Sequence, residues 1–97
     1  MARVVYSAAA LDDLERLVDF LLQTSNRTAA GALLQIRTAV DVLSGHPRIG
    51  RRVRGQLREL VISHGASGYI ALYRFDAARS LVRVLRIRHQ REAGFRD

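Results

Sequence analysis

Cysteine and lysine are both absent from this chain of 97 residues. Without cysteine there can be no disulfide bond, no thiolate zinc site and no cysteine nucleophile. The three histidines, His46, His64 and His89, are widely spaced, which argues against a metal site, and no motif indicates a cofactor. No apolar run approaches the roughly 20 residues of a membrane span, and the sequence does not open on a secretion signal. We therefore expect a cytoplasmic protein that uses neither metal nor cofactor and does not enter a membrane.

The length of the chain fits one domain, and we expect residues 1–97 to fold around a single core. A chain of this size buries roughly 65% of the surface that it exposes when unfolded. Hydrophobic residues make up 48% of the sequence, so this core needs no covalent support.

The net charge of +7 is concentrated in the second half of the sequence. Residues 1–45 carry four arginines against five acids, which gives −1, whereas residues 46–97 carry twelve arginines against four acids, which gives +8. Such a field accelerates encounter with acidic proteins or nucleic acid. Planar guanidinium groups suit bidentate binding of carboxylate or phosphate, but a GC-rich genome would also favour arginine over lysine. Genome composition does not explain why the arginines gather in one half.

The first half of the sequence predicts a strand followed by a helix. Arg3–Ser7 has the composition of a strand, and Ser7 is suited to cap the helix that follows. Asp12, Asp13 and Glu15 then lie in the early turns, where the helix dipole favours acids. Apolar residues at helical spacing give this helix a single stripe, formed by Leu11, Leu14, Val18, Leu21 and Leu22.

A second helix is predicted to begin with Thr28 as its cap and to end before Gly45 and Pro47. It also has one apolar stripe, formed by Leu33, Ile36, Val40 and Leu43. Two helices with one stripe each predict a helical hairpin that rests on a sheet.

The second half of the sequence predicts a basic connector and then three strands. Arg48–Gly55 is the connector, and the strands are expected at Leu57–Ser63, Tyr69–Asp76 and Leu81–His89. Short connections favour an antiparallel meander. The predicted fold class is α+β with the order β-α-α-β-β-β, in which the helical hairpin packs on one face of a small, mainly antiparallel sheet.

The last strand combines aliphatic residues with arginines. Strict alternation would place Ile87 with Arg83 and His89 on one face, and Val82 and Val84 with Arg86 and Arg88 on the other. Neither face is purely polar, so we expect a central strand whose arginines emerge at its end. One helical layer would leave the second, mostly apolar sheet face for a partner segment to cover.

The order of elements and several local signatures resemble the RelE/ParE superfamily of toxins from type II toxin–antitoxin pairs. The matching segments are Ser7–Leu14, Ala29–Ala30, Leu43 with Pro47–Arg51, Arg58–Leu60, Tyr69–Arg74 and Val84–Glu92.

The two branches of this superfamily imply different activities. RelE-like members are ribosome-dependent endoribonucleases that cut messenger RNA, and they share a basic residue on the third strand, a lysine on the second and a tyrosine in the tail. This sequence has Ile70 and Phe95 at two of those places and has no lysine. The chain is more similar to ParE-like members, which implies a DNA gyrase inhibitor without catalytic residues of its own.

The resemblance implies that a ParD-like antitoxin neutralises the protein, with a homodimer or a heterotetramer with the antitoxin as the assembly. An acidic, amphipathic antitoxin segment would suit the +8 half of the chain. Two alternatives stay open: a RelE-type RNase using His89, Arg86 and Arg88, and a non-toxic module on the same fold that binds a partner or nucleic acid.

The candidate functional residues are basic and lie in the second half of the sequence. They are expected to bind the target or the antitoxin and comprise Arg51, Arg52, Arg58, Arg83, Arg86, Arg88, His89 and Arg91. Tyr73 is predicted to be a core aromatic, and Gly50 is predicted to permit a tight turn.

Overall fold

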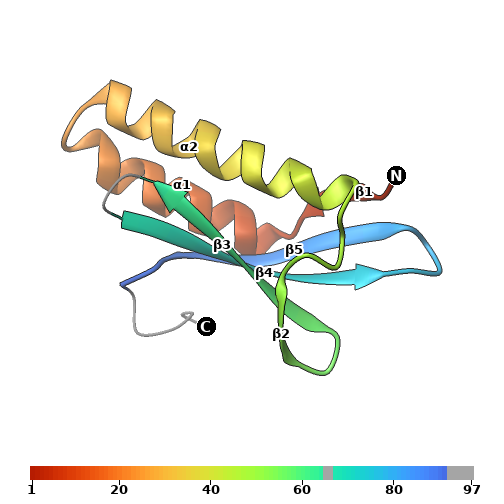
Figure 1. The fold of residues 1–97 in the computed structure, drawn as a ribbon. Coiled ribbons are helices and arrows are strands. Elements are labelled where there is room, and N and C mark those ends of the chain that lie inside the picture. The colour runs from red at the N-terminus through yellow and green to blue at the C-terminus, as the bar shows by residue number, and fades with distance from the viewer. Residues whose placement is uncertain (65–66, 92–97) are drawn as a thin grey trace.

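A computed structural model describes residues 1–64 and 67–91 and places two helices against one five-stranded sheet (Figure 1). The elements are β1 (Arg3–Tyr6), α1 (Ala8–Leu22), α2 (Asn26–Asp41), a 3₁₀ turn (Val42–Ser44), β2 (Arg51–Arg54), β3 (Leu57–His64), β4 (Ser67–Asp76) and β5 (Leu81–His89). The strand order is β1-β5-β4-β3-β2, with β1 parallel to β5 and the other pairs antiparallel. The predicted α+β class, with a helical hairpin on one face of a mainly antiparallel sheet, is confirmed.

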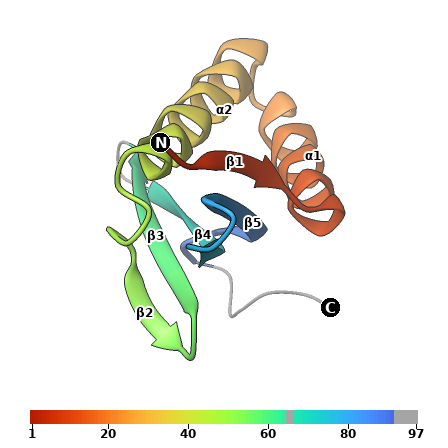
Figure 2. The same ribbon diagram turned by 90° about the vertical axis from the view of Figure 1, so that its right-hand side faces the viewer.

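Strand β2 lies inside the segment that was predicted to be only a connector. All four of its residues are exposed, so no apolar alternation marks it in the sequence. It pairs with β3 through a turn at Gly55, whose φ of +57° is readily adopted only by glycine. Figure 2 shows the resulting β2–β3 hairpin extending away from the helical layer.

The two helices begin at serine caps. The Ser7 hydroxyl accepts the N–H of Ala10 at 3.0 Å, as predicted for the start of α1. The predicted cap of α2 is wrong, because Ser25 and not Thr28 holds that position. The Ser25 hydroxyl accepts the N–H of Thr28 at 2.9 Å and donates to the Thr28 hydroxyl at 2.8 Å, so both side chains stabilise the first turn.

The predicted apolar stripes are confirmed in part. Ile36, Val40 and Leu43 lie in the core, and Leu14 and Leu21 pack against it, but the buried faces also include residues outside the predicted stripes. In α1 the buried residues are Ala10, Asp13 and Leu17, while Leu11 is 53% exposed. In α2 they are Ala29, Ala32, Ile36 and Val40, while Leu33 is 41% exposed. Alanines occupy positions where the layers approach closely, and a pattern based on large apolar residues passes over them.

An additional residue in β5 changes which of its side chains face the helices. Tyr73 of β4 pairs with Val84, but the preceding Leu72 pairs with Arg86, so Leu85 is a bulge. The alternation shifts there, and Ile87 joins Val82 and Val84 in the core. The prediction that Ile87 lies on the opposite face from the two valines was therefore wrong, because it assumed an uninterrupted strand.

Tyr73 is fully buried in the core, as predicted, and its hydroxyl accepts the N–H of Gly50 at 2.8 Å. Gly50 therefore allows a close approach between the loop and the Tyr73 ring, and its φ is not positive. Neither helix of the described chain has the length and apolar content that a membrane crossing requires.

We expect the three tyrosine phenols to ionise at a higher pH than an exposed tyrosine does. Burial raises the pKa of Tyr6, Tyr69 and Tyr73 above the ordinary value of 10.0. A raised pKa means that folding favours the protonated phenol, so this contribution to stability is complete below the unfolded-state pKa and is lost as the pH rises through the folded-state pKa. Phenolate absorbance should therefore rise at higher pH in the folded chain than in urea, and the denaturation midpoint should fall over the same range. Ionisation of all three phenols at pH 10.0 in a still folded chain would contradict this expectation.

Candidate functional site

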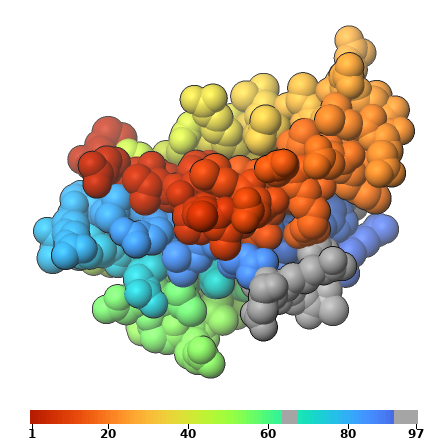
Figure 3. Space-filling model, turned by 180° about the vertical axis from the view of Figure 1, so that it is seen from behind, coloured from red at the N-terminus to blue at the C-terminus, as the bar shows by residue number. Residues whose placement is uncertain are grey.

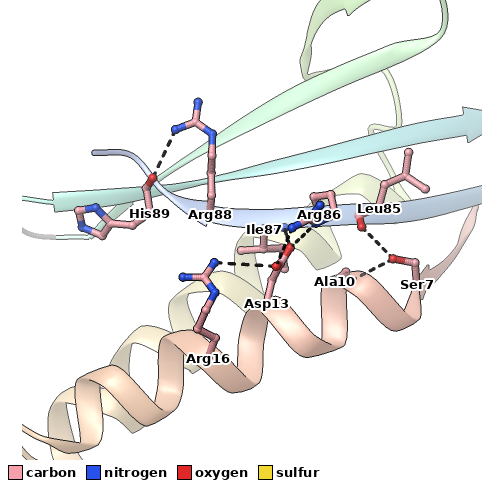
Figure 4. Close-up of polar contacts among 9 residues, drawn as sticks. All are labelled: Ser7, Ala10, Asp13, Arg16, Leu85, Arg86, Ile87, Arg88 and His89. Atoms are coloured by element: carbon pink, nitrogen blue, oxygen red, sulfur yellow. Dashed lines mark hydrogen bonds and ion pairs between the residues drawn. The ribbon is translucent and has the colours of Figure 1, made fainter. Parts of the chain in front are cut away.

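Helix α1 closes the edge of β5 where β1 ends. The last register pair of these strands is Tyr6 with Val84. Beyond it, the Ser7 hydroxyl donates to the carbonyl of Leu85 at 2.8 Å. The Asp13 carboxylate then accepts the N–H of Ile87 at 2.9 Å, so side chains of the helix N-terminal half continue the pairing (Figure 4).

Asp13 also holds Arg86 in a buried ion pair. Nε of Arg86 donates to Oδ2 of Asp13 at 2.8 Å, and Nη2 donates to Oδ1 at 3.2 Å. The Asp13 side chain is only 6% exposed and that of Arg86 is 20% exposed, while Arg16 approaches the same carboxylate at 3.8 Å (Figure 4). Arg86, predicted to bind a partner, therefore has a structural role that the sequence analysis did not predict.

The helix-dipole interpretation of Asp13 is wrong, because Asp13 lies beyond the first turn and its carboxylate bonds to β5. A signal for this role is present in the sequence. Asp13 lies at helical spacing from Ala10 and Leu17, on a face that is otherwise buried. An acid on an apolar helix face requires a buried partner, and an arginine within an aliphatic strand provides one.

The end of β5 carries a second polar group, formed by Arg88, His89 and Arg91. The His89 ring meets Tyr69 edge-on, with 5.5 Å between the ring centroids, and its Nδ1 accepts the N–H of Arg91 at 3.1 Å. Nη1 of Arg88 donates to the carbonyls of His89 and Gln90 at 3.3 and 3.4 Å. These bonds orient the Arg88 guanidinium and the His89 ring, and they fix the backbone of Arg91.

The remaining predicted arginines lie farther from this end of the sheet. Arg51 forms an ion pair with Glu59 at 2.8 Å, and Arg52 donates to the carbonyl of Gly55 at 3.1 Å. Arg83 is exposed and lies opposite Arg74. Arg58 donates to two backbone carbonyls, those of Arg48 and Gly50, at 3.0 and 2.8 Å. The eight candidates therefore do not form one site. Arg88, His89 and Arg91 lie toward one end of the sheet, and Arg52, Arg58 and Arg83 lie toward the other. Arg51 and Arg86 lie in the same row between these groups, because Arg51 pairs with Glu59, Glu59 with Leu72 and Leu72 with Arg86.

Several of the described side chains that could transfer protons are buried or bonded. Tyr69 is 2% exposed and Tyr73 is buried, and desolvation raises the pKa of both phenols. Glu59 is bonded to Arg51, and Nδ1 of His89 is occupied by a backbone N–H. Glu92 and Phe95 lie outside the described residues. Within residues 1–64 and 67–91, no three His, Asp or Glu side chains gather where they could hold a metal ion.

Known proteins resemble this chain along almost its whole length. Residues 4–94 match the family model of the ParE toxin of the type II toxin–antitoxin system parDE. Toxin RelE2 of Caulobacter vibrioides is 38% identical over 92% of this chain and 96% of its own length, and Toxin RelE3 of the same organism is 36% identical over 95% and 98%.

Solved structures share the fold. The chromosomal ParDE system from P. aeruginosa contains a chain that superposes with a TM-score of 0.74 at 20% identity, over 92% of this chain and 96% of that one. The intact E. coli RelBE complex contains one with a TM-score of 0.62 at 17% identity, over 90% and 94%. The predicted superfamily resemblance is confirmed.

Proposed function

Since this chain belongs to the ParE toxin family of type II toxin–antitoxin systems, we propose that it is a cytoplasmic toxin that inhibits DNA gyrase by binding. The observation that carries the proposal is the engagement of the proton-transfer groups. Cleavage at a 2′-hydroxyl needs one group to take a proton and another to give one. Tyr69, Tyr73 and Glu59 are buried or bonded, and arginine cannot exchange protons at neutral pH. The engagement of these groups supports a toxin that acts by binding its target and not by cleaving RNA.

We propose that Arg88, His89 and Arg91 contact gyrase. They lie together at the end of β5, where the Arg88 guanidinium is restrained by two carbonyls and the backbone of Arg91 is bonded to the His89 ring. Preorganised guanidinium groups lose less conformational entropy on binding than unrestrained ones.

The proposed partner in the resting cell is a ParD-like antitoxin with an acidic, amphipathic segment. Large apolar side chains are exposed on both helices, including Phe20, Leu22 and Leu34. Such a segment would cover apolar and cationic surface together.

The gyrase proposal predicts a cleavage product in a purified system. Gyrase, supercoiled plasmid and this protein together should accumulate linear DNA, because a gyrase inhibitor of this kind traps the enzyme on cut DNA. Replacing both Arg88 and Arg91 by alanine should weaken binding to gyrase by at least about a hundredfold and reduce linear DNA accordingly, since charged contacts contribute roughly 1.5–3 kcal/mol each. Replacing both Arg27 and Arg37 by alanine removes two exposed charges from α2; this variant is the matched control and should leave cleavage unchanged.

A second candidate function is a ribosome-dependent RNase, and the names of the Caulobacter relatives favour it. It would use His89 together with Arg86 and Arg88. Translating ribosomes should then acquire cut transcripts when the protein is added, while plasmid supercoiling by gyrase continues. That pair of results would overturn the gyrase proposal. Undisturbed growth on induction would instead favour the non-toxic binding module.

A further inference from the structure

We propose that a recess at the hairpin end of the sheet is a second functional surface, which binds the phosphodiester backbone of nucleic acid. The recess has a volume of about 570 Å³ and lies between the β2–β3 turn and the β4–β5 turn. Four arginines line it, together with Phe75 and Asp76: Arg48, Arg52, Arg58 and Arg74. In Figure 3 the two hairpin ends form separate protrusions, the β4–β5 turn in blue and the β2–β3 hairpin in green.

The recess exists because β3 and β4 stop pairing before β4 ends. Their last register pair at this end is Leu57 with Arg74. Strand β4 continues to Asp76 but pairs there with β5, through Phe75 with Val82 and Asp76 with Leu81. The two hairpins therefore separate beyond Leu57, and arginine side chains line the space between them.

The charge of the recess is not compensated within the described chain. Among residues 1–64 and 67–91, none of these four guanidinium groups lies within ion-pair distance of a carboxylate. The Asp76 carboxylate accepts the N–H of Arg79 and lies 3.9 Å from the Arg79 guanidinium, so it is used by its own turn. The recess thus presents four positive charges beside one negative charge.

The fold holds two of the arginines in place. Arg58 donates to the carbonyls of Arg48 and Gly50, and the Arg48 guanidinium lies 4.8 Å from the centroid of the Phe75 ring. Carbonyl and aromatic partners orient a guanidinium without neutralising it. The positive field therefore remains available to an external anion.

Register pairing adds an independent indication. Arg52 lies opposite Arg58 across β2 and β3, and Arg74 lies opposite Arg83 across β4 and β5. Like charges directly opposite each other destabilise a sheet. Two such pairs beside one recess are unfavourable for folding alone, and a bound polyanion would relieve both.

The lining favours a phosphodiester chain over an acidic peptide. Phe75 is the one large apolar side chain of the recess, and Arg48 lies over its ring. An amphipathic peptide would need an apolar strip, and base recognition would need an open stacking surface. Guanidinium groups spread over several strands instead match successive phosphates, which implies binding without sequence preference.

The test uses the whole protein and a short labelled DNA duplex, without gyrase, so its outcome is separate from that of the gyrase assay. The variant Arg52→Gln/Arg74→Gln should weaken binding about tenfold at low salt and reduce the slope of log K against log salt by about 2. It should fold normally and unfold at a slightly higher temperature, because both like-charge pairs are removed. Arg27→Gln/Arg37→Gln on α2 removes the same charge from the other half of the chain and should bind DNA nearly as the parent does.

Several results would overturn the proposal. One is equal DNA binding by the recess variant and the parent. Another is an equal loss in the α2 variant, which would assign binding to net charge alone. If inorganic phosphate displaced the duplex at matched phosphate concentration, the recess would be a single-anion site. If the recess variant lost affinity for a polyglutamate peptide but not for the duplex, the partner would be an acidic protein.

Discussion

Replacing Asp13 by alanine should destabilise the protein by about 3–5 kcal/mol, because it leaves a mostly buried guanidinium without its carboxylate. The same change removes the acceptor for the N–H of Ile87 at the edge of β5. For a chain of this size, a loss of 3 kcal/mol lowers the thermal midpoint by roughly 15 °C. Urea denaturation followed by circular dichroism would measure it.

Asp12 provides the matched control for this change. It precedes Asp13 on the same helix but is exposed, so Asp12→Ala should alter the free energy of unfolding by less than about 0.5 kcal/mol. A double-mutant cycle with Arg86→Ala should give a coupling of about 1–3 kcal/mol between Asp13 and Arg86. Equal effects of the Asp12 and Asp13 substitutions would show that the buried ion pair does not stabilise the fold.

Replacing Gly50 by alanine should lower the free energy of unfolding by about 3 kcal/mol. A Cβ at this position would lie 2.6 Å from both Cε1 and the hydroxyl oxygen of Tyr73, and 2.8 Å from the carbonyl oxygen of Glu59. The ring is in the core and the carbonyl belongs to β3, so neither can move without disturbing packing. Displacement of the loop would also break the bond between the Gly50 N–H and the Tyr73 hydroxyl.

Gly31 offers a control with the opposite sign. It lies in α2, and no neighbouring atom lies within 4 Å of a Cβ built there. Gly31→Ala should therefore stabilise the protein by about 0.5–1 kcal/mol, the difference in helix propensity between the two residues. Chemical denaturation of both variants would measure the contrast, and a Gly50→Ala variant as stable as the parent would contradict the described contact.

Local sequence patterns were sufficient for the order of both helices and of every strand except β2, and for one helix cap. Ser7 is recognisable because a cap depends on a few neighbouring residues, and the three long strands are marked by β-branched and aromatic residues. Which side chains of β5 face the helices could not be predicted from local patterns. The bulge at Leu85 arises from pairing with β4, and one additional residue moves Ile87 to the other side of the sheet.

The candidate site was predictable only in its composition. The arginines of the second half are evident in the sequence, but their positions along the sheet depend on register. Arg48 and Arg74 were passed over as site residues, because they are brought to one recess by two hairpins that separate. The sequence signals that Asp13 needs a buried partner, but it does not identify that partner, because Arg86 and Ile87 lie more than seventy positions away.

The position of β5 has a consequence for biosynthesis. It is the last strand along the described chain, yet it lies between β1 and β4, and it is hydrogen-bonded to Ser7 and Asp13 near the start of α1. During synthesis, β1 therefore cannot pair with its neighbouring strand until the ribosome has released Leu81–His89. The emerging polypeptide cannot assume its final shape gradually, so harm to the producing cell should begin only after synthesis has passed this strand.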